Sequence, residues 1–147
     1  MSILVAGTFS RIHIGHEKLI MSAYNIADKS AELVEISLAS DMYAKKYKKH
    51  YVSLFDRMKI METYLEDMYG CDWCENFIIT SFDSPFDGVD DRYITTIVCS
   101  QETLMNVLAF NKMRAVHNIP EVNIYCIPLT LNDFGKKLSS TELIENE

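Results

Sequence analysis

The sequence has few of the residues that build flexible linkers, disulfide frameworks or membrane spans. Its 147 residues include only five glycines and three prolines, and no Pro/Gly-rich tract separates one part of the chain from another. No apolar run approaches the roughly 20 residues that a membrane helix needs. Four cysteines beside a full hydrophobic complement do not indicate a disulfide scaffold, because such scaffolds support small secreted domains that lack a core. We therefore expect one soluble domain over residues 1–147, with reduced thiols.

Positive charge is also scarce. Fourteen lysines and arginines stand against 21 aspartates and glutamates, which gives a formal net charge of -7. Nucleic-acid binding needs a basic face, so this balance argues against a nucleic-acid partner. The exception is the cluster KKYKK at residues 45–49. The first residues are strand-like and show no basic or amphipathic leader, so we expect a cytoplasmic protein with no membrane partner.

Short apolar runs of strand type alternate with longer segments of helical period. The residue pattern predicts strands over 2–6, 32–39, 76–82, 93–99 and 122–129. It predicts helices over 17–29, 53–69 and 102–116, with Gly70 as a C-cap and a short last helix capped by residues 139–142. Alternating strands and helices imply parallel pairing and a sheet covered on both faces. The predicted fold is therefore a single-domain α/β structure with a doubly wound, five-stranded parallel sheet.

Polar residues gather where the predicted strands end. Ser40 and Asp41 follow the second strand, Ser100 to Glu102 the fourth, and the serines near residue 140 the fifth. The carboxyl ends of parallel strands share one edge of the sheet, where such folds bind their ligands. This convergence predicts a binding site at that edge.

The segment GTFSRIHIGH, residues 7–16, follows the first predicted strand directly. A helix that begins near His16 would present free N–H groups and a positive dipole end to an anion, which suits a phosphate. Gly7 and Gly15 would let the backbone approach it. Thr8, His13 and His16 would donate hydrogen bonds to polyphosphate oxygens and stabilise charge that develops as a phosphoryl bond breaks.

This segment resembles the signature of the HIGH-motif nucleotidyltransferases, which is close to G-T-F-D-x-x-H-x-G-H. The sequence KLSSTEL at residues 137–143 is similar to their second phosphate motif, I-S-S-T-x-I-R. The segments between them resemble the archaeal and eukaryotic type of phosphopantetheine adenylyltransferase. These segments are SDMYAKK at 40–46, SLFDR at 53–57, DSPFDG at 83–88, VCSQETL at 98–104 and FNKMR at 110–114.

The resemblance implies a Rossmann-like nucleotidyltransferase fold and the transfer of the adenylyl group of ATP to 4'-phosphopantetheine, giving dephospho-coenzyme A and pyrophosphate. It implies that Mg²⁺ accompanies ATP, held chiefly by phosphates and water, with no dedicated metal ligands in the chain. The sequence leaves the oligomeric state open, homo-oligomers included. By the same resemblance, ATP phosphates would be held by Thr8, His13, His16, Ser139, Ser140 and Thr141.

Other positions follow from the same motifs. Lys45 or Lys46 would meet the phosphate shared between the substrates, and Asn111 and Arg114 would line the same pocket. The further motif positions in the nucleotide site are Phe9, Ser10, Ser100 and Glu102. We expect the catalytic set to be Thr8, His13, His16 and Lys45.

The sequence departs from the family pattern at several positions. Ser10 stands where aspartate is usual, Arg11 where proline is common, and Glu142 and Glu145 where basic residues are expected. Two alternatives therefore stay open. The first alternative to phosphopantetheine adenylyl transfer is another HIGH-motif nucleotidyltransferase, such as a cytidylyl-, FMN- or NMN-adenylyltransferase. The second is a nucleotide-binding homologue without turnover.

Overall fold

The computed structural model describes residues 1–47 and 51–128. Five strands form one sheet in the order β3-β2-β1-β4-β5, and each neighbouring pair is parallel. The strands are β1 (Ser2–Gly7), β2 (Leu33–Ala39), β3 (Phe77–Phe82), β4 (Ile94–Ser100) and β5 (Asn123–Ile127). The helices are α1 (Ile14–Ser30), α2 (Asp41–Tyr47), α3 (Leu54–Tyr69), the short 3₁₀ helix η1 (Trp73–Glu75) and α4 (Leu104–Val116).

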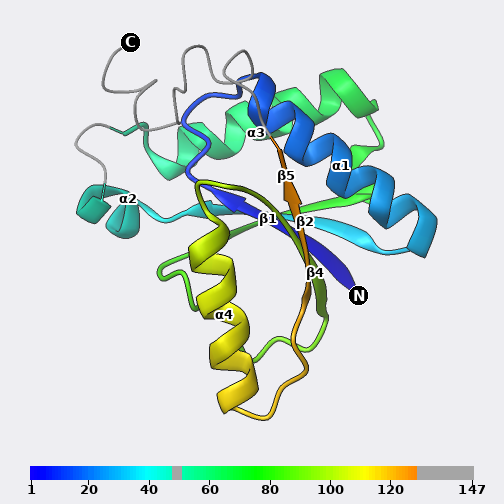
Figure 1. The fold of residues 1–147 in the computed structure, drawn as a ribbon. Coiled ribbons are helices and arrows are strands. Elements are labelled where there is room, and N and C mark those ends of the chain that lie inside the picture. The colour runs from blue at the N-terminus through cyan, green and yellow to red at the C-terminus, as the bar shows by residue number, and fades with distance from the viewer. Residues whose placement is uncertain (48–50, 129–147) are drawn as a thin grey trace.

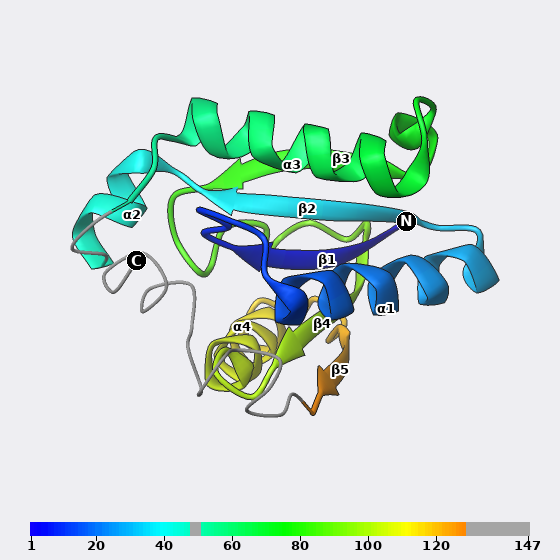
Figure 2. The same cartoon turned by 90° about the horizontal axis from the view of Figure 1, so that it is seen from above.

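Helices cover both faces of the sheet, as the sequence predicts (Figure 1). Helices α1 and α3 lie on one face and α4 lies on the other, and the view from above shows the strand order (Figure 2). Strand β1 shows why both faces need cover, because successive side chains point to opposite faces. Ile3 and Val5 enter the core cluster beneath α1 and α3, whereas Leu4 enters the cluster beneath α4. The doubly wound α/β fold is confirmed.

Helices α1 and α3 both end at a residue with positive φ, but only α3 ends at a glycine. At the end of α3, Gly70 has φ +94° and donates its N–H to the carbonyl of Glu66, so the predicted C-cap is confirmed. At the end of α1, Ala31 adopts the left-handed conformation, with φ 56°. Most predicted element boundaries agree with the structure within two residues.

Helix α1 is the larger difference, because it begins at Ile14 and not at the predicted Glu17. Helix α2 has no counterpart among the predicted elements. It is a single short helix whose first residues are held by neighbours: Ser40 accepts the N–H of Tyr43 at its Oγ, and Ala44 is fully buried. A seven-residue helix gains little from propensity alone, so its stability comes from these contacts.

Candidate active site

A cavity of about 340 Å³ opens at the carboxyl ends of the strands. Its volume lies in the range typical of small-molecule sites, roughly 300–1,000 Å³. Its lining combines apolar and polar side chains. The apolar ones include Leu4, Ala6, Ile97, Val107 and Phe110, and the polar ones include Thr8, His16, Ser37, Tyr43, Ser84, Asp87, Ser100, Glu102, Thr103 and Asn106.

The position of this cavity follows from the strand order. From β1 the chain continues to β2 and β3 on one side, and it returns to β4 and β5 on the other. The loops after β1 and β4 therefore diverge to opposite faces and leave a crevice between them. Gly7 ends β1, Thr8 lies in the loop that follows it, and Ser100 ends β4; all three line the cavity.

The first turn of α1 is closed by two histidines. His13 is the N-cap, and its Nδ1 accepts hydrogen bonds from the N–H groups of Gly15 at 3.0 Å and His16 at 3.3 Å. His16 Nδ1 in turn lies 3.4 Å from the backbone nitrogen of His13. The two rings stack, with centroids 3.7 Å apart. This reciprocal pair is a capping box made of imidazoles, and it starts the helix three residues before the predicted position.

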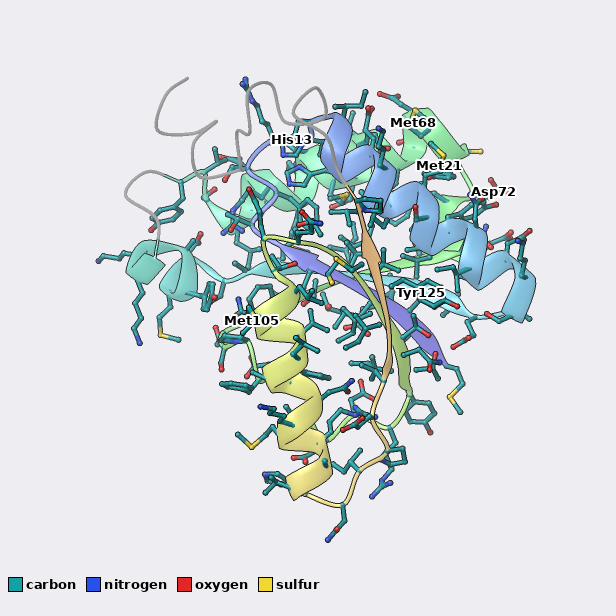
Figure 3. The ribbon with its side chains drawn as sticks, in the orientation of Figure 1. His13, Met21, Met68, Asp72, Met105 and Tyr125 are labelled. Carbon is teal, nitrogen blue, oxygen red and sulfur yellow. The ribbon has the colours of Figure 1, made fainter. Side chains whose placement is uncertain are left out.

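The cap fixes the protonation state of His13. An Nδ1 that accepts two N–H groups carries no proton, so the neutral ring has its proton on Nε2. Burial, and secondarily the charge of Arg11, lowers the pKa of His13 to about 4. His13 is therefore neutral near pH 7, and it lies at the N-terminal end of α1 (Figure 3).

The backbone after β1 is held in a strained shape beside the cavity. Phe9 has φ 53°, which a bulky residue rarely adopts, and its side chain is 1% exposed. The ring lies 4.7 Å from that of His16 and directly over Gly7. A Cβ on Gly7 would sit 3.1 Å from Phe9 Cε2, so glycine permits this close packing.

The structure brings six of the sequence-predicted residues to the cavity: Gly7, Thr8, Phe9, His16, Ser100 and Glu102. Three others of the GTFSRIHIGH segment lie just outside its lining. Gly15 is buried in the first turn of α1, His13 caps that turn, and Ser10 is 3% exposed. Within the described part of the chain, the Oγ of Ser10 has no hydrogen-bond partner.

Lys45 and Lys46 are exposed near the end of α2 and do not line the cavity. The same helix nevertheless reaches it, because Tyr43 contributes to the lining and its ring packs on Phe82 at 5.2 Å. Ser139, Ser140 and Thr141 lie outside the described residues. Their expected role in holding the ATP phosphates together with His16 therefore stays a prediction.

Asn111 and Arg114 were expected to line the pocket, but in the structure their side chains bond to backbone groups of other segments. Asn111 is bonded to both backbone groups of Val122, through Nδ2 at 2.9 Å and Oδ1 at 2.7 Å. Arg114 is 2% exposed and donates to three carbonyl oxygens. These belong to Pro120, Val89 and Asp91. Neither side chain lines the cavity, because both are used to attach the segment before β5 and the loop before β4 to α4.

The candidate site residues from the sequence did not include several residues of the lining. Ser37 comes from β2 and Asn106 from the first turn of α4, outside every motif segment. Tyr43 and Thr103 lie within the segments SDMYAKK and VCSQETL but were not named as candidates. The loop after β3 adds residues from the segment DSPFDG, and that resemblance was its only sequence signal. This loop is well built: Asp83 N donates to Asp87 Oδ2 at 2.7 Å, and Phe86 N donates to Ser84 Oγ at 3.2 Å.

Other sequence features carry no site. Over residues 1–47 and 51–128, no group of three histidine, cysteine, aspartate or glutamate side chains is placed to hold a metal ion. In the same ranges, no helix is both long and apolar enough to cross a bilayer.

All four cysteines are free. Cys99 is buried on β4, and this burial raises the pKa of its thiol to about 11. Cys126 is exposed, because β5 is an edge strand.

Comparison with known proteins agrees with this architecture. The cytidylyltransferase-like family model matches residues 4–146. The phosphopantetheine adenylyltransferase of Methanopyrus kandleri is 30% identical over 142 residues, which cover 96% of this chain and 87% of the relative. That of Methanothermobacter thermautotrophicus is 30% identical over 146 residues, covering 99% of this chain and 84% of the relative.

Solved structures share the fold at lower identity. A protein of unknown function from Archaeoglobus fulgidus superposes with a TM-score of 0.75 at 24% identity, covering 86% of this chain and 89% of that one. A lipopolysaccharide core biosynthesis protein from Thermoplasma volcanium gives a TM-score of 0.60 at 14% identity, covering 86% of this chain and 95% of that one. The resemblance inferred from the motifs is thus confirmed, and the chain belongs to the cytidylyltransferase-like family of nucleotidyltransferases.

Proposed function

We propose that this protein transfers the adenylyl group of ATP to the phosphate of 4'-phosphopantetheine, forming dephospho-coenzyme A and pyrophosphate. The observation that carries the proposal is the cavity at the switch point of the sheet, where Gly7, Thr8 and His16 share the lining with apolar side chains. The names of the archaeal relatives support the choice of substrates. We place the reaction in the cytoplasm, because the sequence leads us to expect the protein there.

The reaction needs little covalent help from the protein. A phosphate oxygen of phosphopantetheine attacks the α-phosphorus of ATP, the new P–O bond forms, and the bond from that phosphorus to the α,β-bridging oxygen breaks. Pyrophosphate leaves with the electron pair. Since the attacking oxygen is already anionic, positioning and charge stabilisation supply most of the acceleration.

The residues beside the cavity suit these two tasks. His16 is 8% exposed and lies in the first turn of α1, where the helix dipole favours negative charge. Its Nδ1 accepts the N–H of His13 in the capping box, so the neutral ring carries its proton on Nε2. Nε2–H can therefore donate to a phosphate oxygen. His16 would thus stabilise the charge that develops on the transferring group.

His13 and Thr8 support the same site. His13 holds the first turn of α1 in place, because its Nδ1 accepts the N–H groups of Gly15 and His16. The ring of His16 thereby keeps a fixed position beside the cavity. Thr8 would contribute its hydroxyl from the cavity wall. The apolar side chains of the lining suit the adenine ring or the pantetheine arm, both of which bury carbon surface on binding.

Mg²⁺ would enter with ATP as part of the substrate complex. Since the described residues form no cluster of metal ligands, we assign the ion to the phosphates and water, and the protein would hold the complex through its phosphate groups. Lys45, on the exposed end of α2, would meet the acceptor phosphate. The C-terminal serines would complete the phosphate site.

The test is pyrophosphate release from ATP and Mg²⁺ with a panel of acceptors: 4'-phosphopantetheine, FMN, nicotinamide mononucleotide and phosphocholine, the last with CTP. We expect release with phosphopantetheine and a product with the mass of dephospho-coenzyme A. Release with another acceptor only would replace the proposed substrate. Tight ATP binding without release from any acceptor would identify a nucleotide-binding protein that has lost turnover, as the departure at Ser10 allows.

A further inference from the structure

Among the residues that the structure describes, Arg57, in the first turn of α3, is the largest side chain that is completely buried. A buried guanidinium needs partners for its N–H groups, and Arg57 has four. Its Nη1 donates to the carbonyl oxygens of Thr8 at 3.0 Å and Ala39 at 2.6 Å. Its Nε donates to the carbonyl of Val52 at 2.6 Å, and its Nη2 pairs with Asp41 Oδ1 at 3.2 Å.

The partners other than Val52 lie at the ends of two neighbouring strands or directly after them. Thr8 lies in the loop after β1 and lines the cavity. Ala39 is the last residue of β2, and Asp41 is the first residue of α2. One side chain therefore joins the proposed phosphate loop to the helix that carries Tyr43 and the two lysines.

The bond to Thr8 controls the orientation of a peptide group in that loop. In a trans peptide the C=O and the following N–H point in opposite directions. Since the Thr8 carbonyl is directed to Arg57, the N–H of Phe9 is directed away from it. The left-handed conformation of Phe9, φ 53°, is disfavoured for a bulky residue and persists only where its surroundings hold it. Arg57 supplies a charge-assisted bond for this purpose.

The bond to Asp41 controls the position of α2. The Oδ1 of Asp41 accepts from Arg57 and also from the N–H of Leu54 at 2.7 Å, so this carboxylate connects the starts of α2 and α3. The side chain of Asp41 is 50% exposed, whereas that of Arg57 is 0% exposed. The guanidinium of Arg57 thus pairs with a carboxylate on the solvent side, and its other N–H groups donate to backbone carbonyl oxygens.

We propose that Arg57 is a positioning residue for adenylyl transfer: it fixes the Thr8–Phe9 peptide relative to α2, and so aligns the bound nucleotide with the acceptor phosphate. The inference rests on the function proposed above. A lysine could not replace Arg57, because one ammonium on a flexible stem cannot donate to acceptors that lie on several sides of a planar guanidinium.

The test compares Arg57→Lys with Leu65→Ala. Leu65 is fully buried in the same helix and does not line the cavity, so it controls for a general loss of stability. Amide hydrogen exchange is followed by mass spectrometry on both variants and on the wild-type protein. In Arg57→Lys we expect exchange at least tenfold faster in residues 7–16 and 40–46, and unchanged exchange in residues 104–127. We also expect kcat for adenylyl transfer to fall at least tenfold, and by much less in Leu65→Ala.

A second variant, Asp41→Ala, guards against failure of Arg57→Lys to fold. It leaves the three carbonyl bonds of Arg57 intact, so exchange should rise in residues 40–46 and stay unchanged in residues 7–16. Equal acceleration in all segments, or no acceleration near Thr8 in Arg57→Lys, would overturn the inference. If the wild-type protein shows no turnover with any acceptor, the proposed function fails, and the exchange comparison decides the role of Arg57 on its own.

Discussion

In the first turn of α1, imidazoles occupy the two positions that serine or threonine and glutamate or glutamine hold in ordinary capping boxes. His13 accepts two backbone N–H groups at one nitrogen, which only the neutral ring can do. Helix capping therefore couples to protonation in this protein. The consequence is a stability that depends on pH through a residue beside the proposed phosphate site.

Acid should weaken the fold through His13. Its pKa is lowered to about 4 in the folded protein, first by burial and then by Arg11, whereas the unfolded chain has the ordinary value of about 6.5. Between these values the unfolded chain binds more protons, so the free energy of unfolding falls as pH drops from 6.5 toward 4. We expect a loss of about 1–2 kcal/mol from this group between pH 7 and pH 5.

The measurement is urea unfolding at both pH values for the wild-type protein and for His13→Asn. Asparagine is a strong N-cap that does not titrate, so the variant should lose less stability on acidification. Identical losses in the two proteins would show that His13 does not set this pH dependence.

His16 has a structural and a proposed chemical role, and two variants separate them. His16→Ala removes both, so adenylyl transfer should fall about 10²–10³-fold and the free energy of unfolding by about 1 kcal/mol. In His16→Gln a glutamine at the third helical position can restore the bond to the His13 N–H. We expect this variant to recover stability and to stay as inactive as His16→Ala. Recovery of turnover in His16→Gln would assign the residue to capping alone.

At the scale of elements, α4 does more than cover the sheet. Through Asn111 it pairs with both backbone groups of Val122, at the entry to the edge strand β5. Val122 is 5% exposed, so these groups have no ready access to water when the side chain is removed. We expect Asn111→Ala to lower the free energy of unfolding by about 2–4 kcal/mol.

Urea unfolding tests this expectation, with Lys112→Ala as the control. Lys112 is the exposed neighbour of Asn111 on α4, and its removal should change the free energy of unfolding by less than about 0.5 kcal/mol. A comparable effect of the two substitutions would contradict the structural role of Asn111.

Helix α2 carries the proposed contact to the acceptor. Lys45→Ala should raise KM for phosphopantetheine by about tenfold, the effect of losing about 1.4 kcal/mol of charge-assisted binding, with KM for ATP unchanged. Lys59→Ala, which removes the same charge from the exposed face of α3, should leave both constants unchanged. A shift in the KM for ATP alone would place Lys45 at the nucleotide and not at the acceptor.

The sequence predicts helices and strands whose apolar residues repeat with a clear period within the segment. It misses elements that are stabilised by contacts to residues distant in the chain. The alternation of Ile3, Leu4 and Val5 between two covered faces, and the period of α3, are visible in single segments. Helix α2 is not, because its start depends on Ser40 and on a carboxylate bound to a distant arginine. The same applies to Asn111, whose partner Val122 is eleven residues away in the chain.

For the whole molecule, motif resemblance locates the wall that contains Gly7, Thr8 and His16, because glycine and histidine in this order are a local feature. It does not locate the opposite walls, since Ser37, Tyr43 and Asn106 come together only through the strand order. Resemblance alone also misplaces Asn111 and Arg114, because a motif gives their identity and not the direction of their side chains. Arg57 lies in the motif segment SLFDR, but the motif does not indicate its role. Only its complete burial and its four hydrogen-bond partners show that it joins two parts of the site.

The central claim is that the cavity at the switch point of the sheet holds the nucleotide, with its phosphates beside the start of α1. The most direct measurement is a crystal structure of the protein grown with a non-hydrolysable ATP analogue and Mg²⁺. The account predicts phosphate oxygens within hydrogen-bond distance of Thr8 and of His16 Nε2, and the base or sugar inside the cavity. A nucleotide bound elsewhere, with the cavity between β1 and β4 left to solvent, would contradict it.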